Sequence, residues 1–372
     1  MMLKEISLNS LLRPGVRFTS KFIPGCIKIL LFCILLCTGS GGILFAQNVE
    51  TDISVEGPLR GYNTFIPYSL FLHSPAMPSA PMEKGAWEFG LNFYLTNDFH
   101  SYKLVMAGGA TEYHRINDYE SIIAECMLQH QFTESVSAIG IVRYAAYWTG
   151  FMDEIIEGFH SVFGFQNAGR EYFPNYEVLI NLTNNNGLEI YADSSVAALG
   201  DTDLWLKYAF AVPWADAAVW AGMKLPTGAI SGESIISTGY PDFALQASAD
   251  VPYKRYFMGY FQGGVTVPGD LLFSGGTQTP TPFFHGLAAL GFNPGGNISY
   301  LGQLNVKTTV LSGPINHWLF NVDRLLLPQT NLLFGIVSKI RGYRWQFYFE
   351  EDFLTNEGAD LTVGVQVSRQ FR

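Results

Sequence analysis

The amino-acid sequence predicts an all-β protein: a closed antiparallel transmembrane β-barrel of about 12 strands with long external loops. Three observations carry this prediction. Apolar and polar side chains alternate along many segments, the connections alternate between short and long, and the chain begins with a segment typical of exported proteins. The composition agrees, because 15% of the residues are aromatic, only 15% are charged and 38 are glycine. This mixture suits strands better than helices.

Residues 1–46 are predicted to be a secretory signal peptide. An apolar run, Ile29–Leu36, follows a basic region, and Leu44-Phe45-Ala46 is a plausible cleavage site; the basic residues are Lys4, Arg13, Arg17, Lys21 and Lys28. An N-terminal membrane anchor is the alternative, which the short apolar run disfavours. Without this segment 17 basic and 31 acidic residues remain, and the resulting net charge of −14 argues against nucleic acid as a partner. Only Cys126 lies outside it, so an internal disulfide and a cysteine-based zinc site are excluded.

Residues 47–84 are predicted to form a proline-rich N-terminal arm. Five prolines interrupt the segment, at positions 58, 67, 75, 78 and 81. Proline cannot donate to a strand ladder, so this segment is not a membrane strand. Its aromatic residues Tyr62, Phe65, Tyr68 and Phe71 favour an arm that packs against something. The arm would lie in the periplasm or fold into the barrel mouth, and whether it plugs the barrel is open.

The third segment, 85–372, is predicted to form the outer-membrane β-barrel. In its first strand, 86–99, Trp87, Phe89, Leu91 and Phe93 share one face, and polar residues share the other. The last strand, 360–371, alternates in the same way. Further strands are predicted at 119–131, 135–148, 202–212, 217–225, 242–251, 256–267, 283–292, 298–310, 330–340 and 343–353. Lengths of about ten residues suit tilted strands that cross a bilayer.

The connections favour a barrel over a soluble sandwich. Five are short: Thr133-Glu134, 213–216, 252–255, 293–297 and Arg341-Gly342. They alternate with loops near 100–118, 149–201, 226–241, 268–282, 311–329 and 354–359. Outer-membrane barrels place short turns in the periplasm and long loops outside. Loop 149–201 is predicted to hold a helix within 154–164 and an external hairpin around Asn186-Gly187, which would raise the count to 14 strands if it crossed the bilayer.

Several short motifs resemble a known family. They are Phe151-Met152-Asp153, Ile156-Glu157, His160, Phe163-Gly164, Gly169-Arg170-Glu171 and Leu225-Pro226-Thr227-Gly228. With them the chain, from about Pro58 to its end, resembles a bacterial outer-membrane β-barrel family catalogued only as a domain of unknown function (family 3187). The resemblance implies a barrel in the outer membrane. It brings no assigned activity, so no functional residue is carried over.

Alternation also identifies candidate lumen residues. Arg or Lys on the lipid face near the membrane midplane would cost about 2–4 kcal/mol, so charged residues of the strands must point inward. The lumen-facing candidates are Glu88, Glu125, Arg143, Lys207, Lys224, Gln303, Lys307, Lys339, Arg344 and Glu350. These residues would line a polar, narrow or plugged passage, which we favour, or pair with one another and close the interior.

A second set of candidates lies in loop 149–201: Asp153, Glu157, His160 and Arg170. They could ligate a metal or bind a solute at the barrel mouth, but solvated helix faces carry the same residue types. We favour the interpretation that the apolar side of the helix packs into the mouth, with Arg170 as a partner for a carboxylate. No metal site and no cofactor are predicted.

We therefore expect a passive channel or facilitator for an unidentified small solute in the cell outer membrane. The alternatives are a structural or surface-interaction barrel with a closed interior and, less favoured, a barrel enzyme. Catalysis would need a nucleophile and a base within reach, and His73-Ser74, His100-Ser101 and His160-Ser161 all lie in the arm or in predicted loops; we predict no catalytic residue. The expected partners are outer-membrane lipid, the barrel-assembly machinery through the C-terminal strand, and a small solute.

Overall fold

The computed structural model describes residues 57–62, 64–66, 68–105, 111–163, 170–183, 189–228, 236–273, 276–309, 316–317, 320–321, 328–352 and 359–372. The predicted signal peptide, residues 1–46, lies outside them. Within the described ranges no helix is long and apolar enough to cross a membrane.

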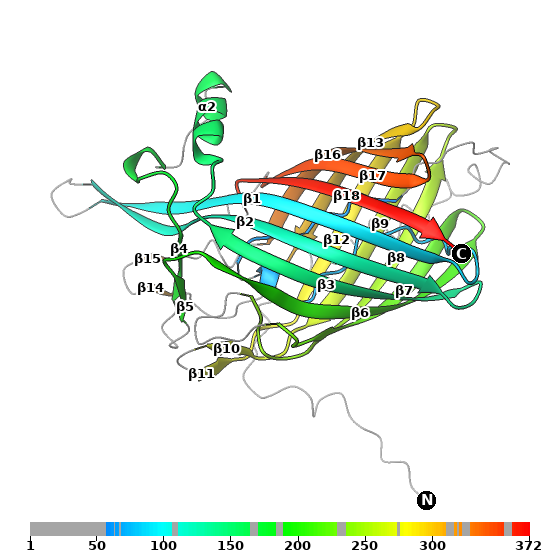
Figure 1. Cartoon of the computed structure of the whole chain (residues 1–372), viewed down its shortest axis with the longest axis horizontal. Coiled ribbons are helices and arrows are strands. Elements are labelled where there is room, and N and C mark those ends of the chain that lie inside the picture. The colour runs from blue at the N-terminus through cyan, green and yellow to red at the C-terminus, as the bar shows by residue number, and fades with distance from the viewer. Residues whose placement is uncertain are drawn as a thin grey trace, which may run out of the picture. The chain divides into compact units, whose positions relative to one another are not determined.

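Twelve strands of the described chain close into one antiparallel barrel (Figure 1). They are β1 (Trp87–Val105), β2 (Thr111–Gln131), β3 (Val136–Trp148), β6 (Val196–Val212), β7 (Ala215–Leu225), β8 (Asp242–Tyr253), β9 (Phe257–Val267), β12 (Phe283–Phe292), β13 (Ile298–Lys307), β16 (Gln329–Ile340), β17 (Tyr343–Asp352) and β18 (Leu361–Phe371). Each pairs with the next barrel strand in the chain, and β1 also pairs with β18, from Trp87↔Phe371 to Asn97↔Leu361. Closure leaves no unpaired strand edge within the bilayer. The predicted fold class is confirmed.

The remaining elements lie in the arm and the long loops. In the arm is a short helix, η2 (Tyr68–Leu70). Between β3 and β6 come α2 (Asp153–Phe163), η3 (Arg170–Tyr172), β4 (Leu179–Thr183) and β5 (Glu189–Ala192). Two small hairpins are β10 (Leu271–Phe273) with β11 (Gly276–Gln278), and β14 (Asn316–His317) with β15 (Phe320–Asn321). Because β4 joins β2 only at Asn117 and Asp118, the β4–β5 hairpin is outside the barrel, and the count is twelve rather than fourteen.

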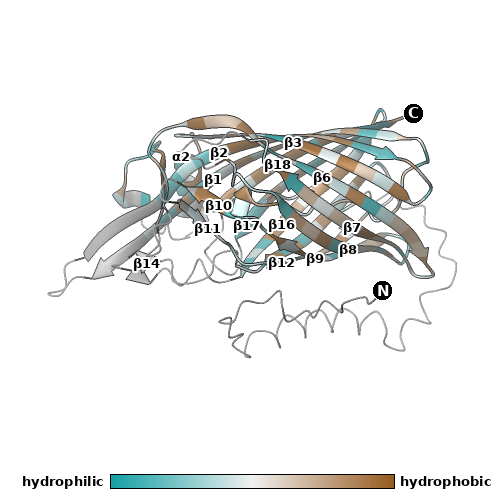
Figure 2. Ribbon diagram, turned by 90° about the horizontal axis from the view of Figure 1, so that it is seen from below, coloured by the Kyte–Doolittle hydropathy of each residue, from teal (hydrophilic) through white to brown (hydrophobic). Residues whose placement is uncertain are grey.

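The barrel has its apolar side chains outside and its polar side chains inside. Phe93, Leu206, Leu245 and Phe347 are among the large apolar residues exposed on the outer wall. The residues that alternate with them are buried and largely polar, so hydrophobic and hydrophilic positions alternate along the strands (Figure 2). A water-soluble sheet protein would have the opposite arrangement, and lipid explains this one.

Short turns gather at one end of the barrel and long loops at the other, which we call the short-turn end and the long-loop end. The turn between β16 and β17 consists of Arg341 and Gly342, with φ angles of 54° and 81°. Two central residues with positive φ form the turn type whose twist matches a two-residue hairpin. The C-terminus lies at the short-turn end, since Phe371 pairs with Trp87.

Two predicted loops are shorter than expected. β1 and β2 stay paired as far as Val105 and Thr111, so most of 100–118 is strand, and β6 begins at Val196 instead of 202. These extensions project from the long-loop end (Figure 1). Residues beyond the bilayer do not need lipid-facing alternation, because main-chain pairing alone continues the ladder. The ladder also shifts register between His100 and Ser101, opposite one extra residue of β2 between Asn117 and Arg115, and such a bulge interrupts the period-two pattern.

Candidate functional site

The described residues of the arm, 57–62, 64–66 and 68–84, lie inside the barrel and run up one side and down the other. On the ascending branch the Thr64 hydroxyl donates to the hydroxyl of Thr96 on β1 at 2.8 Å. On the descending branch the Leu72 amide donates to Asp242 at the long-loop end of β8 (2.8 Å), and the Ser79 amide donates to Asp250 near its other end (2.7 Å). The η2 helix therefore forms the tip of a loop inserted into the lumen.

Lumen side chains hold this arm by its backbone. The Lys207 ammonium donates to the carbonyls of Pro78 and Ala80, at 2.7 and 2.6 Å, and the Lys224 ammonium donates to the Leu70 carbonyl at 2.6 Å. Further carbonyl acceptors are bound by amides and a hydroxyl, in the pairs Gln346–Pro58, Gln303–Leu59, Tyr348–Arg60 and Gln262–Met77. The inward polar residues thus satisfy an irregular chain that has no strand partner.

Apolar packing anchors the ascending branch and the tip. Arm residues Leu59, Tyr62, Phe65 and Phe71 belong to one buried cluster with inward residues of the wall, among them Tyr94, Tyr119, Tyr147, Leu333 and Tyr348. The Tyr62 ring stacks on His73 of the opposite branch at a centroid distance of 3.9 Å. The predicted packing role of the arm aromatics is explained by this cluster inside the barrel.

A charge network centred on Arg143 crosses the interior. Its guanidinium donates to Glu125 on β2 at 2.8 Å and to Asp203 on β6 at 2.5 Å. The arm contributes Arg60, whose Nε lies 3.9 Å from the Glu125 carboxylate. The Arg143 guanidinium also lies over the Tyr62 ring, 4.9 Å from its centroid. Three strands, β2, β3 and β6, and the arm are thus tied together by buried charges that pair with one another.

A second network surrounds Lys224. Its ammonium lies 3.2 Å from Asp201 and 3.0 Å from Asp242, in addition to its bond to the arm. Near the short-turn end Arg344 and Glu88 form a looser pair at 3.5 Å. Opposite charges across the lumen are therefore largely matched rather than segregated.

The predicted lumen residues are placed as follows. Glu88, Glu125, Arg143, Lys207, Lys224, Gln303 and Glu350 are buried in the interior, Lys307 and Arg344 are half-buried, and Lys339 is exposed at the short-turn end. Sequence reasoning missed Arg60 and the buried acids Asp201, Asp203, Asp242 and Asp250. The alternation could have predicted two of these acids. Asp203 lies four residues before Lys207 on β6, and Asp242 lies four residues before Gln246 on β8, so each pair shares one strand face. Arg60 offered no such signal, since the arm has no period.

Arg170 joins the large loop to the barrel. Its guanidinium donates to Asp153 at the start of α2 (2.5 Å), to Asn97 on β1 (2.8 Å) and to Asp360 before β18 (2.5 Å), and it lies over the Phe99 ring at 4.5 Å. Glu157 is half-buried on α2, and the side chain of His160 lies outside the described residues. In the part of the chain that is described, no cluster of His, Cys, Asp and Glu could hold a metal. Two of the four loop candidates thus converge, as an ion pair.

Replacing this arginine by alanine, Arg170→Ala, is expected to release the loop that carries α2. The change leaves the Asp153 carboxylate buried without its guanidinium, which costs about 3 kcal/mol or more. Limited proteolysis of the purified protein should cut within 149–195 at least about tenfold faster. The matched control is Arg372→Ala, because Arg372 pairs with Glu83 in an exposed ion pair of little energetic value. Equal cleavage rates of the two variants would contradict this role of Arg170.

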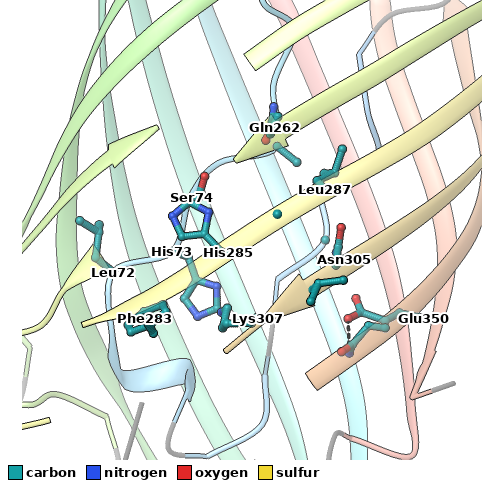
Figure 3. A pocket seen from close by; sticks show the side chains of 15 residues that line it. Leu72, His73, Ser74, Gln262, Phe283, His285, Leu287, Asn305, Lys307 and Glu350 are labelled. Carbon is teal, nitrogen blue, oxygen red and sulfur yellow. Dashed lines mark hydrogen bonds between the residues drawn. The ribbon is translucent and has the colours of Figure 1, made fainter. Parts of the chain in front are cut away.

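A cavity of about 70 Å³ remains between the descending branch of the arm and the wall formed by β9, β12, β13, β16 and β17. His73 and Ser74 line it from the arm, and His285, Lys307 and Glu350 line it from the strands (Figure 3). His73 is bonded to the Tyr68 carbonyl at 3.1 Å, while the Ser74 hydroxyl is buried without a partner in the described structure. The adjacent His73 and Ser74 therefore do not form the hydrogen-bonded pair that a serine nucleophile needs.

Burial determines the protonation state of two arm side chains, His73 and Tyr62. It lowers the pKa of His73 well below its usual value, and the nearby charges of Lys307 and Arg143 lower it further. Burial also raises the pKa of the Tyr62 phenol. Both rings are therefore neutral at pH 7, which suits their stacking in the apolar cluster.

Comparison with known proteins places the chain in a family. The family described as "Protein of unknown function (DUF3187)" matches residues 34–363. The curated proteins contain no significant match. A crystal structure of an outer membrane channel from Pseudomonas putida F1 is similar, with 12% identity and a TM-score of 0.55 over 81% of this chain and 100% of that chain.

The P. putida toluene transporter TodX aligns with 79% of this chain and 92% of its own, at 9% identity and a TM-score of 0.38. Nothing is inferred from this weak likeness to TodX. At 12% identity, the likeness to the outer membrane channel shows a shared fold only. The family match spans most of the sequence and is decisive. The chain belongs to the DUF3187 family of proteins of unknown function.

Proposed function

We propose that this protein is an outer-membrane facilitator for a small polar solute, with residues 57–84 as a movable plug. The observation that carries the proposal is that the wall holds the plug through hydrogen bonds from lumen side chains to its backbone. Lys207, Lys224, Gln303 and Gln346 make such bonds. Water or a polar solute can replace a backbone carbonyl as their partner, so each bond from an amide contributes only about 0.5–1.5 kcal/mol net and each bond from an ammonium about 1.5–3 kcal/mol.

The orientation of the barrel in the membrane follows from the placement of the turns. Outer-membrane barrels have their short turns in the periplasm, so the long-loop end faces outward. The plug is then joined to the barrel on the periplasmic side, because residue 84 is followed directly by β1 at the short-turn end. A solute would enter between the long loops and pass along the polar wall when the plug shifts.

The proposal is tested by locking the plug with a disulfide. The hydroxyl oxygens of Thr64 and Thr96 are 2.8 Å apart, and those of Ser79 and Ser248 are 2.9 Å apart. At such separations paired cysteines are close enough to bond after small rotations. T64C/T96C and S79C/S248C would be made in a Cys126→Ser background, since Cys126 is a free, exposed cysteine. In planar bilayers the unlocked protein should show discrete openings, and both locked variants should be silent until a reducing agent is added.

The control for each lock is the corresponding single-cysteine variant, which should conduct like the parent. If the parent is silent in all salts tested, the proposal fails and the barrel has a closed interior. That second candidate, a structural or surface-interaction barrel, is favoured by one observation: the Arg143 network pairs charges across the lumen. If the locked proteins conduct as the parent does, the passage does not require plug movement.

Acid pH should loosen the plug through His73. A released arm would bind a proton on this histidine near its ordinary pKa of about 6.5, whereas the docked arm resists protonation because its pKa is lowered. Docked stability is therefore complete above pH 6.5 and declines as the pH falls. At pH 5 the ratio of released to docked arm should rise by up to about thirtyfold.

Open probability measured from pH 8 to pH 5 checks this expectation. The groups that face His73 are Lys307 on β13, Arg143 on β3 and His285 on β12. His73→Gln keeps a hydrogen-bonding side chain but cannot be protonated, so it should remove this part of the pH dependence. An unchanged pH profile in His73→Gln would assign the effect to another group.

A further inference from the structure

The cavity between the plug and the wall has the features of a binding site. It is at the long-loop end of the lumen, because His285 is the third residue of β12 and Lys307 is the last of β13, and the two are register partners. Figure 3 shows the imidazole rings, Ser74 and Lys307 on one side of the cavity and Glu350 on the other. The site is therefore formed by both the wall and the movable plug.

Polar atoms around this cavity lack partners within the described structure. The Glu350 side chain belongs to a residue only 4% exposed, and its Oε1 accepts from Asn331 at 2.7 Å while its Oε2 accepts nothing. His285 Nε2 and the Ser74 hydroxyl are also buried without a hydrogen bond. Buried polar atoms in native proteins are nearly always paired, so a polar occupant is expected here.

The charges around the cavity indicate the chemistry of that occupant. Lys307 supplies a basic group, and its side-chain nitrogen lies over the rings of Tyr68 and Phe283, 5.6 and 5.7 Å from their centroids. Glu350 supplies an acidic group, and no ion pair of 4.0 Å or less joins it to Lys307 among the described residues. A base and an acid held apart across a small space match a ligand that itself carries one negative and one positive group.

The volume limits the size of the ligand. The cavity measures about 70 Å³, and about 10–15 Å³ of such space holds one water molecule. It therefore takes about five to seven non-hydrogen atoms. We propose that this cavity binds a small α-amino-acid zwitterion, with its carboxylate toward Lys307 and His285 and its ammonium toward Glu350. The inference deepens the proposed function, on which it rests, by naming the class of solute.

The test is calorimetric titration of the full-length protein in detergent at pH 7.5. Glycine carries both charges, acetate only the negative one and methylamine only the positive one. Glycine should bind with one site per chain, and acetate and methylamine should bind at least about tenfold more weakly, as expected for loss of one charge-assisted hydrogen bond. Glu350→Gln and Lys307→Met should each weaken glycine binding by at least about tenfold.

Matched controls keep the side-chain changes but move them away from the cavity. Glu134→Gln lies in an exposed turn, and Lys339→Met lies at the exposed short-turn end; both should bind glycine like the parent. Glu350→Gln is nearly isosteric and can keep its bond to Asn331, and heat-modifiable migration on a gel confirms that each variant is folded.

Three results would overturn the inference. The first is no heat of binding with any probe, which means that water alone fills the cavity. The others are a glycine affinity no higher than that of acetate and methylamine, and a glycine affinity unaffected by both substitutions. Bilayer recordings separate these failures from failure of the proposed function. A protein that conducts but does not bind glycine refutes only the zwitterion site. A protein that binds glycine but never conducts refutes the channel and leaves a zwitterion-binding barrel.

Discussion

Deleting residues 57–82 should convert the barrel into a permanently open pore, with single-channel conductance on the order of tenfold above that of the full-length protein. Barrels of eight strands are filled by their own side chains, but one of twelve strands is wider and here needs the arm to fill it. The lumen groups that now bind the arm backbone, such as Lys207 and Gln303, would be solvated by water instead. Planar-bilayer recordings measure the change.

The disulfide-locked variants, which should not conduct, give the lower limit of conductance for this comparison. Removal of the arm also removes its apolar cluster, so heat-modifiable migration must first show that the shortened chain is a closed barrel. If the deletion variant is folded and its conductance equals that of the full-length protein, the arm does not obstruct the passage. The plug would then have only a stabilising role.

Replacing Arg143 by methionine should cause the largest loss of stability of any single lumen substitution proposed. Glu125 and Asp203 share this guanidinium, at 2.8 and 2.5 Å, and both are buried. Removing one partner from a buried ion network leaves uncompensated charge and costs about 3–5 kcal/mol. Urea unfolding of the barrel in detergent micelles, followed by tryptophan fluorescence, measures the loss.

Neutral amides at the two acidic positions separate charge from packing. The quadruple variant R60M/R143M/E125Q/D203N keeps nearly the same volume and removes all four charges of this network, including buried Arg60 beside Glu125, so it should recover most of the lost stability. Arg143→Lys should recover only part, since an ammonium cannot bind two carboxylates in the planar, forked geometry of arginine. If Arg143→Met is as stable as the parent, water reaches the network and the interior is wetter than the ion pairs indicate.

The strand architecture of this protein is determined by local sequence. Alternation in 86–99 and 360–371, the Arg341-Gly342 turn and the unequal connections together predicted a closed barrel, because lipid imposes a two-residue period on every strand that crosses it. The same pattern placed Glu125, Arg143, Lys207 and Lys224 inside. It failed at 100–118, where the strands leave the bilayer and the period is no longer required.

Only the tertiary structure decided what meets across the lumen. A two-residue period states that His285, Lys307 and Glu350 face inward, but not that they surround one cavity with His73 and Ser74 of the arm. Arg60 and Tyr62 join the Arg143 network because the arm runs through the barrel, and a segment without a period carries no sign of its path. Contacts between distant strands depend on register and closure of the whole ring. The local sequence therefore determines which way each residue points, and the closed barrel with its inserted arm determines which residues meet.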